Sequence, residues 1–154
     1  MSCHFHDKKI LPYGADHLYA IVADVQSYPT FLPGCMAAEI LEKGEGSLRA
    51  QLTIGYGVFK ESYTSKVLLT PETYIEVVYE QGPFQHLKNY WHFVPLSENE
   101  TEVEFFIDFA FRSGFLQKVM ETFFQEGISH LMEAFEKRAF TLKNKAICSK
   151  RPVP

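Results

Sequence analysis

Residues 102–143 read EVEFFIDFAFRSGFLQKVMETFFQEGISHLMEAFEKRAFTLK, and this stretch contains the two patterns that decide the fold. Over residues 102–112 apolar and polar side chains alternate, as in a strand with one buried and one solvated face. The apolar face of that strand comprises Val103, Phe105, Ile107, Phe109 and Phe111. From residue 115 to about 143 the apolar period changes to three or four residues, which is typical of an amphipathic helix. Both apolar faces must be buried, so we predict that the helix packs on the sheet with the stripe Leu116, Val119, Met120, Phe123, Ile128, Leu131, Phe135, Ala139 and Leu142.

The remaining sequence predicts the other strands of that sheet and two short helices. Helical spacing runs from residue 15 to about 24, and a second short helix follows Ser27. Strands are expected where apolar residues alternate between Gly- and Pro-containing turns, over residues 3–11, 36–43, 48–56, 59–70, 74–80 and 87–94. The predicted fold class is α+β, with a curved antiparallel sheet of about seven strands wrapped around a long C-terminal helix. We expect one domain over residues 1–154, with a core of about 3–143 and a tail over 144–154.

The composition limits the classes of partner and compartment. Aromatic residues make up 15% of the 154 residues, with 14 Phe and 8 Tyr, which favours a large apolar interior. The formal net charge of −4 provides no overall basic field, so we expect no DNA partner. Three widely spaced cysteines do not form a disulfide framework, and no apolar run approaches the ~18 residues of a membrane span. We therefore expect a cytoplasmic protein in a bacterium, or one on the matrix side of the inner mitochondrial membrane in a eukaryote, with at most peripheral membrane contact.

Five segments, taken together and in this order, resemble a known family. They are residues 28–35 (YPTFLPGC), 59–67 (FKESYTSKV), 82–93 (GPFQHLKNYWHF), 108–113 (DFAFRS) and 134–139 (AFEKRA). From about residue 8 to 142 the chain resembles the coenzyme Q-binding START-like family of the polyketide cyclase/dehydrase-like superfamily. That family includes mitochondrial quinone-binding proteins and the bacterial ribosome-association toxin RatA.

The resemblance implies the helix-grip (START/Bet v 1-like) fold, with a hydrophobic tunnel between sheet and helix. It also implies ubiquinone or a related polyprenyl lipid as bound cargo, and no cofactor. The chain departs from the family at Gly34, where many members have an aromatic residue, often Trp. The glycine is expected to widen or loosen the mouth of the tunnel.

A quinone is flat and apolar and has two carbonyl acceptors, so its carrier needs apolar walls and one or two hydrogen-bond donors. Phe31, Leu32 and Pro33 form a candidate lid between a short helix and a strand. Tyr56 and Tyr63 are candidate donors to the head group. The candidate walls are inward-facing strand residues and residues of the helix stripe, namely Trp91, Phe93, Phe105, Ile107, Phe109, Phe123, Gly127 and Leu131. Each of these residues also has a simpler interpretation as part of a packed core.

Gly127 is the least expected member of this set because a glycine inside a helix costs roughly 1 kcal/mol relative to alanine. Clearance for a ligand or for a close strand would justify that cost, and a helix kink is the alternative. Glu61 shares the predicted inner face with Phe59 and Tyr63. If Glu61 is buried, it needs a cationic partner.

The remaining polar residues match no reaction site. Cys3, His4 and His6 lie close together in the sequence, but their spacing fits no zinc pattern, so we expect no metal site. No Ser–His–acid or Cys–His set is evident, so we expect no catalytic residues and no enzyme activity. Because START-like folds also include polyketide aromatase/cyclases, an acid–base pair inside the tunnel is the alternative, and its only candidates are Tyr63, Glu61 and His92.

The leading functional hypothesis is a carrier or chaperone for ubiquinone or a related polyprenyl lipid that supports respiratory electron transport. The alternative is a RatA-like toxin that blocks the association of ribosomal subunits. That alternative directs attention to the basic residues that would meet a ribosomal subunit, namely Lys60, Lys66 and Lys88 with the tail residues Lys143, Lys145, Lys150 and Arg151.

Overall fold

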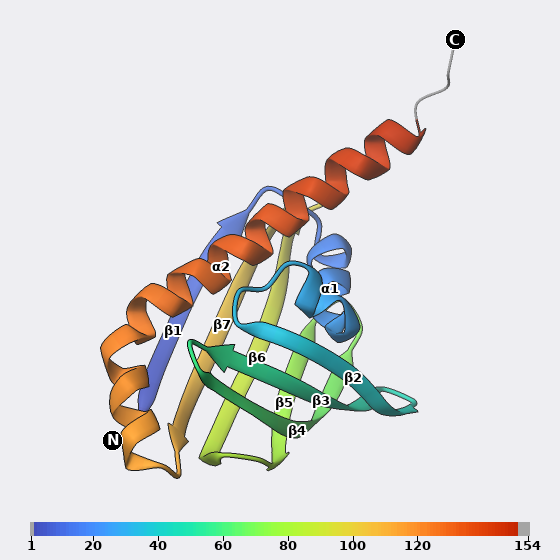
Figure 1. Ribbon diagram of the computed structural model, residues 1–154. Helices are drawn as coiled ribbons and strands as arrows, with labels where there is room; N and C mark the ends of the chain where they lie inside the picture. Colours follow the sequence, from blue (N-terminus) through green and yellow to red (C-terminus); the bar gives the residue numbers. More distant parts are fainter. Residues whose placement is uncertain (1, 151–154) are drawn as a thin grey trace.

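The computed structural model describes residues 2–150, apart from the side chains of Tyr56 and of residues 145–150. A first strand, β1 (Cys3–Leu11), is followed by helix α1 (Ala15–Ala23) and a 3-10 helix, η1 (Val25–Thr30). The chain then forms six strands joined by hairpins and one long helix: β2 (Cys35–Gly44), β3 (Ser47–Tyr56), β4 (Phe59–Thr70), β5 (Tyr74–Gln81), β6 (Phe84–Ser97), β7 (Glu100–Phe111) and α2 (Gly114–Lys150). The strands form one curved sheet, and α2 crosses its concave side diagonally (Figure 1). This architecture confirms the predicted fold class.

The sheet contains seven strands in the order β1-β7-β6-β5-β4-β3-β2, and every neighbouring pair is antiparallel. Strand β1 pairs with β7, so that Cys3 lies opposite Phe109 and the first and last strands of the chain are neighbours in the sheet. Strand β6 is longer than predicted because its pairing with β7 continues through register shifts near both ends, where Phe84 pairs with Phe111 and Ser97 with Glu100. Long paired strands can bend at such irregularities, and the sheet thereby curves around α2.

Helix α2 is fixed at its start to the end of β7. The Phe111 amide donates a hydrogen bond to Oε1 of the buried Gln117 side chain, at 2.8 Å. The face of α2 that packs toward the core contains Met120, Phe124, Ile128, Leu131, Phe135 and Ala139. Since each helical residue advances by about 100°, Phe123 lies beside this face. Phe123 is 41% exposed and Phe124 is 7% exposed, so the predicted stripe was wrong by one position at this turn.

The end of α2 also differs from the prediction. Its backbone is helical through Lys150, beyond the expected end at residue 143. In Figure 1 these last turns project past the edge of the sheet. Residues 144–150 are therefore helix rather than a tail, and residues 151–154 lie outside the described residues.

Helix α1 closes one end of the space between the sheet and α2. Its apolar residues Leu18, Ile21 and Val22 are buried, and the His17 imidazole donates from Nε2 to the Ala139 carbonyl of α2 at 2.9 Å. Side chains fill this end, where a void of only about 30 Å³ remains. The other end of the interior is different, and it forms the candidate site.

Candidate functional site: a cavity between the sheet and helix α2

A cavity of about 330 Å³ lies between the concave face of the sheet and the N-terminal half of α2. Alternate residues of the strands point into it, because side chains on a strand face one side with a period of two. An engineered apolar cavity of about 150 Å³ holds benzene, so this volume holds a substituted ring with the first part of a side chain. The inner-face residues of the strands that line it are Ala50, Leu52, Ile54, Phe59, Tyr63, Ser65, Val67, Ile75, Val77, Leu87, Asn89, Trp91, Phe105, Ile107, Phe109 and Phe111.

Most of the residues predicted to contact a ligand line this cavity. The strands contribute Tyr63, Trp91, Phe105, Ile107 and Phe109. Gly127 and Leu131 line it from α2, and Leu32 and Pro33 line it from the connection between η1 and β2. The structure thus brings together residues from five separate parts of the sequence.

The predicted wall residue Phe93 and the predicted lid residue Phe31 do not line the cavity. Phe93 is buried in the packed end, where it meets Tyr19 of α1 edge to face with ring centroids 5.9 Å apart. Phe31 packs edge to face on Phe135 at 5.5 Å, under the Arg138 guanidinium at 5.0 Å from the ring centroid. Phe31 therefore attaches the connection after η1 to α2 rather than facing the cavity.

Two other predicted ligand-contacting residues, Phe123 and Tyr56, have different outcomes. Phe123 is exposed, and its neighbour Phe124 lines the cavity in its place. The side chain of Tyr56 lies outside the described residues, so its predicted role as a donor stays a prediction.

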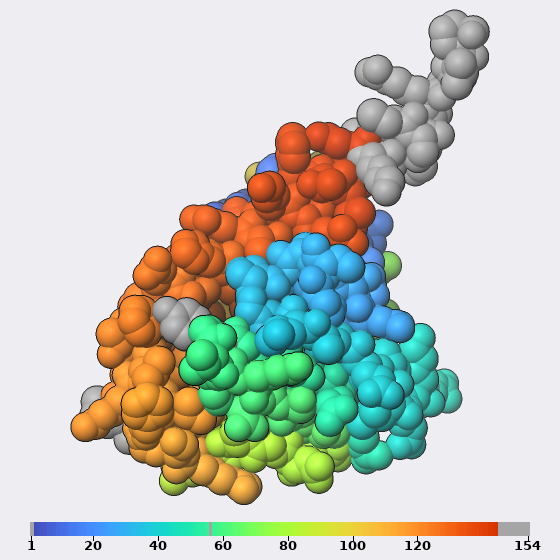
Figure 2. Space-filling model, viewed as in Figure 1, coloured from blue at the N-terminus to red at the C-terminus, as the bar shows by residue number. Residues whose placement is uncertain are grey.

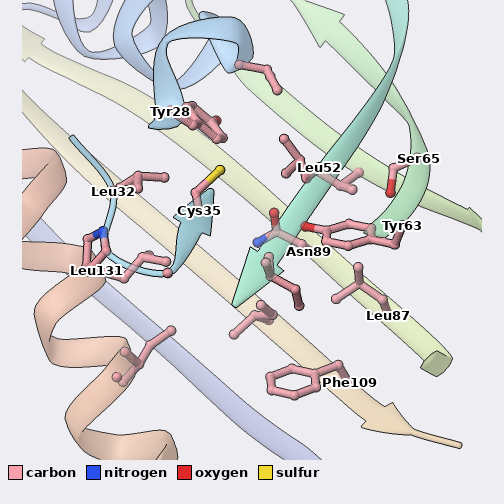
Figure 3. Close-up of a pocket in the computed structure, with 18 of the residues that line it drawn as sticks. Tyr28, Leu32, Cys35, Leu52, Tyr63, Ser65, Leu87, Asn89, Phe109 and Leu131 are labelled. Carbon is pink, nitrogen blue, oxygen red and sulfur yellow. The ribbon is translucent and has the colours of Figure 1, made fainter. Parts of the chain in front are cut away.

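The cavity wall contains a small group of polar side chains that sequence reasoning only partly found. Figure 3 shows Tyr63 and Ser65 extending into the space from β4 and Asn89 from β6, with the Tyr63 hydroxyl directed toward Asn89. Tyr63 was predicted, but Ser65 and Asn89 were missed. The sequence contained the necessary information. Ser65 lies two residues from both Tyr63 and Val67, and Asn89 lies two residues from both Leu87 and Trp91, so each shares the inward face of its strand.

The hydrogen bonding of these polar groups is incomplete within the described part of the chain. The Ser65 side chain is buried, and its Oγ has no hydrogen-bond partner. Asn89 donates from Nδ2 to the Phe106 carbonyl at 2.8 Å, which uses one of its two amide hydrogens. By contrast, the Tyr28 hydroxyl at the rim donates to the Val22 carbonyl. The unused hydrogen-bonding capacity therefore lies on the sheet side of the cavity.

The titratable groups that line the cavity are held in their neutral forms. Burial, with a smaller effect of the nearby Cys35, raises the pKa of Tyr63 far above its ordinary value. Burial also raises the pKa of the Cys35 thiol. Among the described residues, no Asp, Glu, His, Lys or Arg lines the cavity. A charged ligand group would lose its hydration there without gaining a counter-ion, so the cavity suits neutral ligands.

The mouth of the cavity lies between the η1–β2 connection, the β3–β4 hairpin and α2. Pro33, Gly34 and Gly127 line the cavity and are also exposed at the surface. The three segments meet on one face of the molecule in Figure 2, coloured light blue, green and orange. Gly34 has a φ of +84°, a conformation that favours glycine, which explains why no aromatic residue stands there. A Cβ at Gly127 would meet no atom within 4 Å, so a close strand does not explain that glycine.

The outer face of the sheet carries a separate network of charges. Glu104 accepts a hydrogen bond from His6 Nε2 at 2.7 Å, and Asp108 accepts one from His86 Nε2 at 2.9 Å. These histidines lower the pKa of both carboxyls. Within residues 2–144, no three His, Cys, Asp or Glu side chains are grouped so as to hold a metal ion. Glu61 is exposed, which corrects the expectation that it faces inward and needs a buried partner.

This combination of a seven-stranded sheet, a long helix packed on its concave face and an apolar cavity between them agrees with a match to one family model. Residues 11–136 match the family described as polyketide cyclase/dehydrase and lipid transport. The chain belongs to the polyketide cyclase/dehydrase and lipid transport family. The predicted resemblance is thereby confirmed at the level of this family.

Two kinds of curated relatives are similar to the chain. The ribosome association toxin RatA of Pseudomonas aeruginosa is 33% identical over 139 residues, which are 90% of this chain and 96% of the relative. The mitochondrial coenzyme Q-binding protein COQ10 homolog B of Xenopus laevis is 31% identical over 88% of this chain and 57% of the relative.

Solved structures support the fold of this family member. The 18 kDa protein CC1736 from Caulobacter crescentus is 30% identical, with a TM-score of 0.75 over 92% of this chain and 99% of that chain. The ZhuI aromatase/cyclase from Streptomyces gives a TM-score of 0.78 over 90% of this chain and 94% of that chain, at 21% identity. The second likeness shows the fold alone. Among the helices in residues 2–150, none combines the length and hydrophobicity that a membrane crossing requires.

Proposed function

We propose that the chain binds ubiquinone or a related polyprenyl lipid in the cavity and carries it, without chemical change, in support of respiratory electron transport. The observation that supports this proposal is an apolar cavity of about 330 Å³ whose described lining carries no charged residue. Burial of apolar surface at roughly 25 cal/mol per Å² supplies the binding energy. The volume lies at the lower end of the ~300–1,000 Å³ of ligand pockets. It therefore holds the head group and the first part of the tail, and the rest of the tail leaves through the mouth.

The proposed carrier performs no catalysis, and the reason is the chemistry of the residues that line the cavity. General acid–base catalysis needs a group that exchanges protons near neutral pH. Tyr28, Cys35 and Tyr63 line the cavity with raised pKa values and stay protonated. Glu61 is exposed, and His92 lies on the outer face near Glu104, 3.5 Å from Nδ1 to Oε1, so neither completes an acid–base pair with Tyr63.

The test is to identify the lipid that copurifies with the protein, by solvent extraction and mass spectrometry, and then to titrate the protein with ubiquinone. A matched control is Ala50→Phe, because Ala50 is buried in the cavity wall and a phenyl ring there occupies the ligand volume. We expect a quinone or prenyl lipid with the wild-type protein and at least about tenfold weaker quinone binding by the variant. If wild-type protein neither carries nor binds a prenyl lipid, the carrier proposal is wrong.

We also propose that the mouth loads its lipid from a membrane surface. Exposed apolar side chains surround it: Met36 packs over the cavity-lining Gly55, Val58 lies at the tip of the β3–β4 hairpin, and Phe123 lies one helical turn before Gly127. Apolar side chains beside a lipid site favour shallow insertion into a bilayer. Extraction of ubiquinone from phosphatidylcholine vesicles should slow severalfold in Val58→Asp. The control Leu96→Asp, which alters an exposed leucine outside the mouth, should extract at the wild-type rate; equal rates for both variants would contradict membrane loading.

A second candidate function is supported by the RatA relatives and by one feature of the outer face. Lys66 and Lys88 both pair with Val78, so that the two exposed lysines form a row across strands β4, β5 and β6. Cations on a sheet face suit an anionic partner such as ribosomal RNA. Cosedimentation with ribosomal subunits should then weaken with salt and weaken further in Lys66→Glu/Lys88→Glu. The exposed Lys118→Glu on α2 is the control, and binding that is absent or indifferent to salt would exclude this function.

The proposal places the chain in the bacterial cytoplasm, as for a RatA-like protein, or on the matrix side of the inner mitochondrial membrane, as for a COQ10-like one. Fractionation of the source cells, with detection of the chain in each fraction, tests this placement.

A further inference from the structure

The polar side chains of the cavity have hydrogen-bonding capacity that the described part of the chain does not use, and for Ser65 that capacity is fully buried. A buried polar group that leaves water without a hydrogen bond costs about 1–3 kcal/mol. Ser65 is 4% exposed, and its Oγ has no partner. The Tyr63 hydroxyl is directed toward Asn89 (Figure 3), and Asn89 has one amide hydrogen and its Oδ1 in excess of its bond to Phe106.

We propose that Tyr63, Ser65 and Asn89 form a subsite that recognises the uncharged oxygen atoms of a ring head group. This inference rests on the proposed binding of a prenyl lipid and specifies which part of the lipid the cavity recognises. The three side chains project from β4 and β6, which β5 separates, so they approach the cavity from two directions. A ring with oxygens at opposite ends can be hydrogen-bonded from both directions, whereas a hydrocarbon tail can satisfy none of the three.

The subsite also fixes the orientation of the ligand. Tyr63, Ser65 and Asn89 lie on the sheet, whereas the exposed lining residues Gly34 and Gly127 lie at the mouth. The head group therefore enters first, and the tail follows the apolar residues toward the mouth, past Leu131.

The chemistry of the three side chains sets the range of ligands. A hydroxyl donates one hydrogen bond and accepts others, and a carboxamide offers both an N–H and a carbonyl oxygen. The subsite can thus donate to the carbonyls of a quinone and accept from the hydroxyls of the corresponding quinol. We expect it to bind both redox states, and to exclude carboxylates and phosphates because no cation among the described residues lines the cavity.

The test compares three probes: a ubiquinone with one isoprene unit, its quinol, and a prenylbenzene of equal tail length without ring oxygens. Wild-type protein should bind quinone and quinol within about threefold of each other and bind the prenylbenzene at least about tenfold more weakly. Tyr63→Phe and Ser65→Ala should each weaken quinone binding by about three- to tenfold and leave prenylbenzene binding unchanged. Ser62→Ala is the matched control, because Ser62 is exposed on the same strand and its hydroxyl bonds to Thr53.

The outcomes separate this inference from the proposed function. If wild-type protein binds none of the probes, the proposed function fails. If the wild-type protein binds quinone and Tyr63→Phe and Ser65→Ala bind it equally well, the carrier stands and the subsite is wrong. A loss of quinone and prenylbenzene binding to the same extent would show general damage to the cavity and would also overturn the subsite. Unfolding of ligand-free Ser65→Ala in urea gives a second measurement, since removal of an unpaired buried hydroxyl should leave stability unchanged or raised.

Discussion

The two ends of the interior are built on the same sheet and the same helix, yet side chains fill one and leave the other open. Beside α1 a void of about 30 Å³ remains, whereas beside β3, β4 and β5 the cavity measures about 330 Å³. The difference comes from the covering layer, because α1 packs between β6 and α2 at the closed end. At the open end α2, η1 and the η1–β2 connection cover the sheet, and α1 reaches the cavity only through Val22 among the described residues. We therefore expect stability and the proposed ligand binding to depend on different halves of one core, so that mutations separate them.

Truncation of a leucine tests this separation with the largest expected effect. Leu18→Ala, in the closed end, should lower the free energy of unfolding by about 3 kcal/mol, since it removes buried atoms and leaves a void. Leu52→Ala, in the cavity wall, should cost only about 1 kcal/mol because that side chain already borders open space. Urea unfolding of the ligand-free variants measures both. Equal losses would mean that the two ends are packed alike.

Replacing a buried alanine by phenylalanine should lower stability at the closed end and ligand binding at the open end. Ala139 has no exposed surface where α2 meets α1, so Ala139→Phe should destabilise the protein by about 2 kcal/mol through overpacking. Ala50→Phe projects into the cavity and should cost less than about 1 kcal/mol while removing quinone binding. Thermal unfolding and ligand titration provide the two readouts. A severe loss of stability in Ala50→Phe would show that the cavity closes in solution.

Alanine substitution of the two glycines at the mouth should change the free energy of unfolding in opposite directions. Gly34→Ala should cost about 1 kcal/mol, because its φ of +84° is unfavourable for a residue with a Cβ. Gly127→Ala should gain up to about 1 kcal/mol, since alanine favours a helix and its Cβ meets no neighbour. If Gly127 is present for ligand passage, release of bound quinone from Gly127→Ala should also be slower in stopped-flow measurements. Unchanged release with higher stability would assign this glycine no role in binding.

The sequence predicted most of the fold because its two periods are clear, but it did not distinguish these two ends. Alternation along β6 and β7 placed Phe93 and Phe105 on the same inner face, and only the position of α1 decides that Phe93 is packed while Phe105 lines the cavity. A spacing of three or four residues admits both Phe123 and Phe124, and tertiary packing selects Phe124. Ser65 and Asn89 were predictable as inward polar residues, but their missing partners appear only in three dimensions.

Acid should weaken the edge of the sheet formed by β1, β7 and β6, with the smallest of these effects. Hydrogen bonds from His86 and His6 hold the pKa of Asp108 and of Glu104 below their ordinary values of 3.8 and 4.5. A carboxyl with a lowered folded-state pKa stabilises the fold above its unfolded-state pKa, and that contribution is lost as the pH falls through the folded-state value. Unfolding free energy should therefore fall below about pH 4, by less than about 1 kcal/mol per carboxyl because both are partly exposed.

Asp108→Asn isolates this contribution. The variant should lose part of the acid dependence and exchange the amide hydrogens of β1 and β7 faster near neutral pH, while quinone affinity stays unchanged because Asp108 does not line the cavity. Glu126→Gln on α2, an exposed carboxyl, controls for the change in net charge. If acid instead loosens β3 and β4 first, the opposite edge of the sheet limits stability at low pH, and the histidine–carboxylate pairs do not decide the acid stability of the β1–β7–β6 edge.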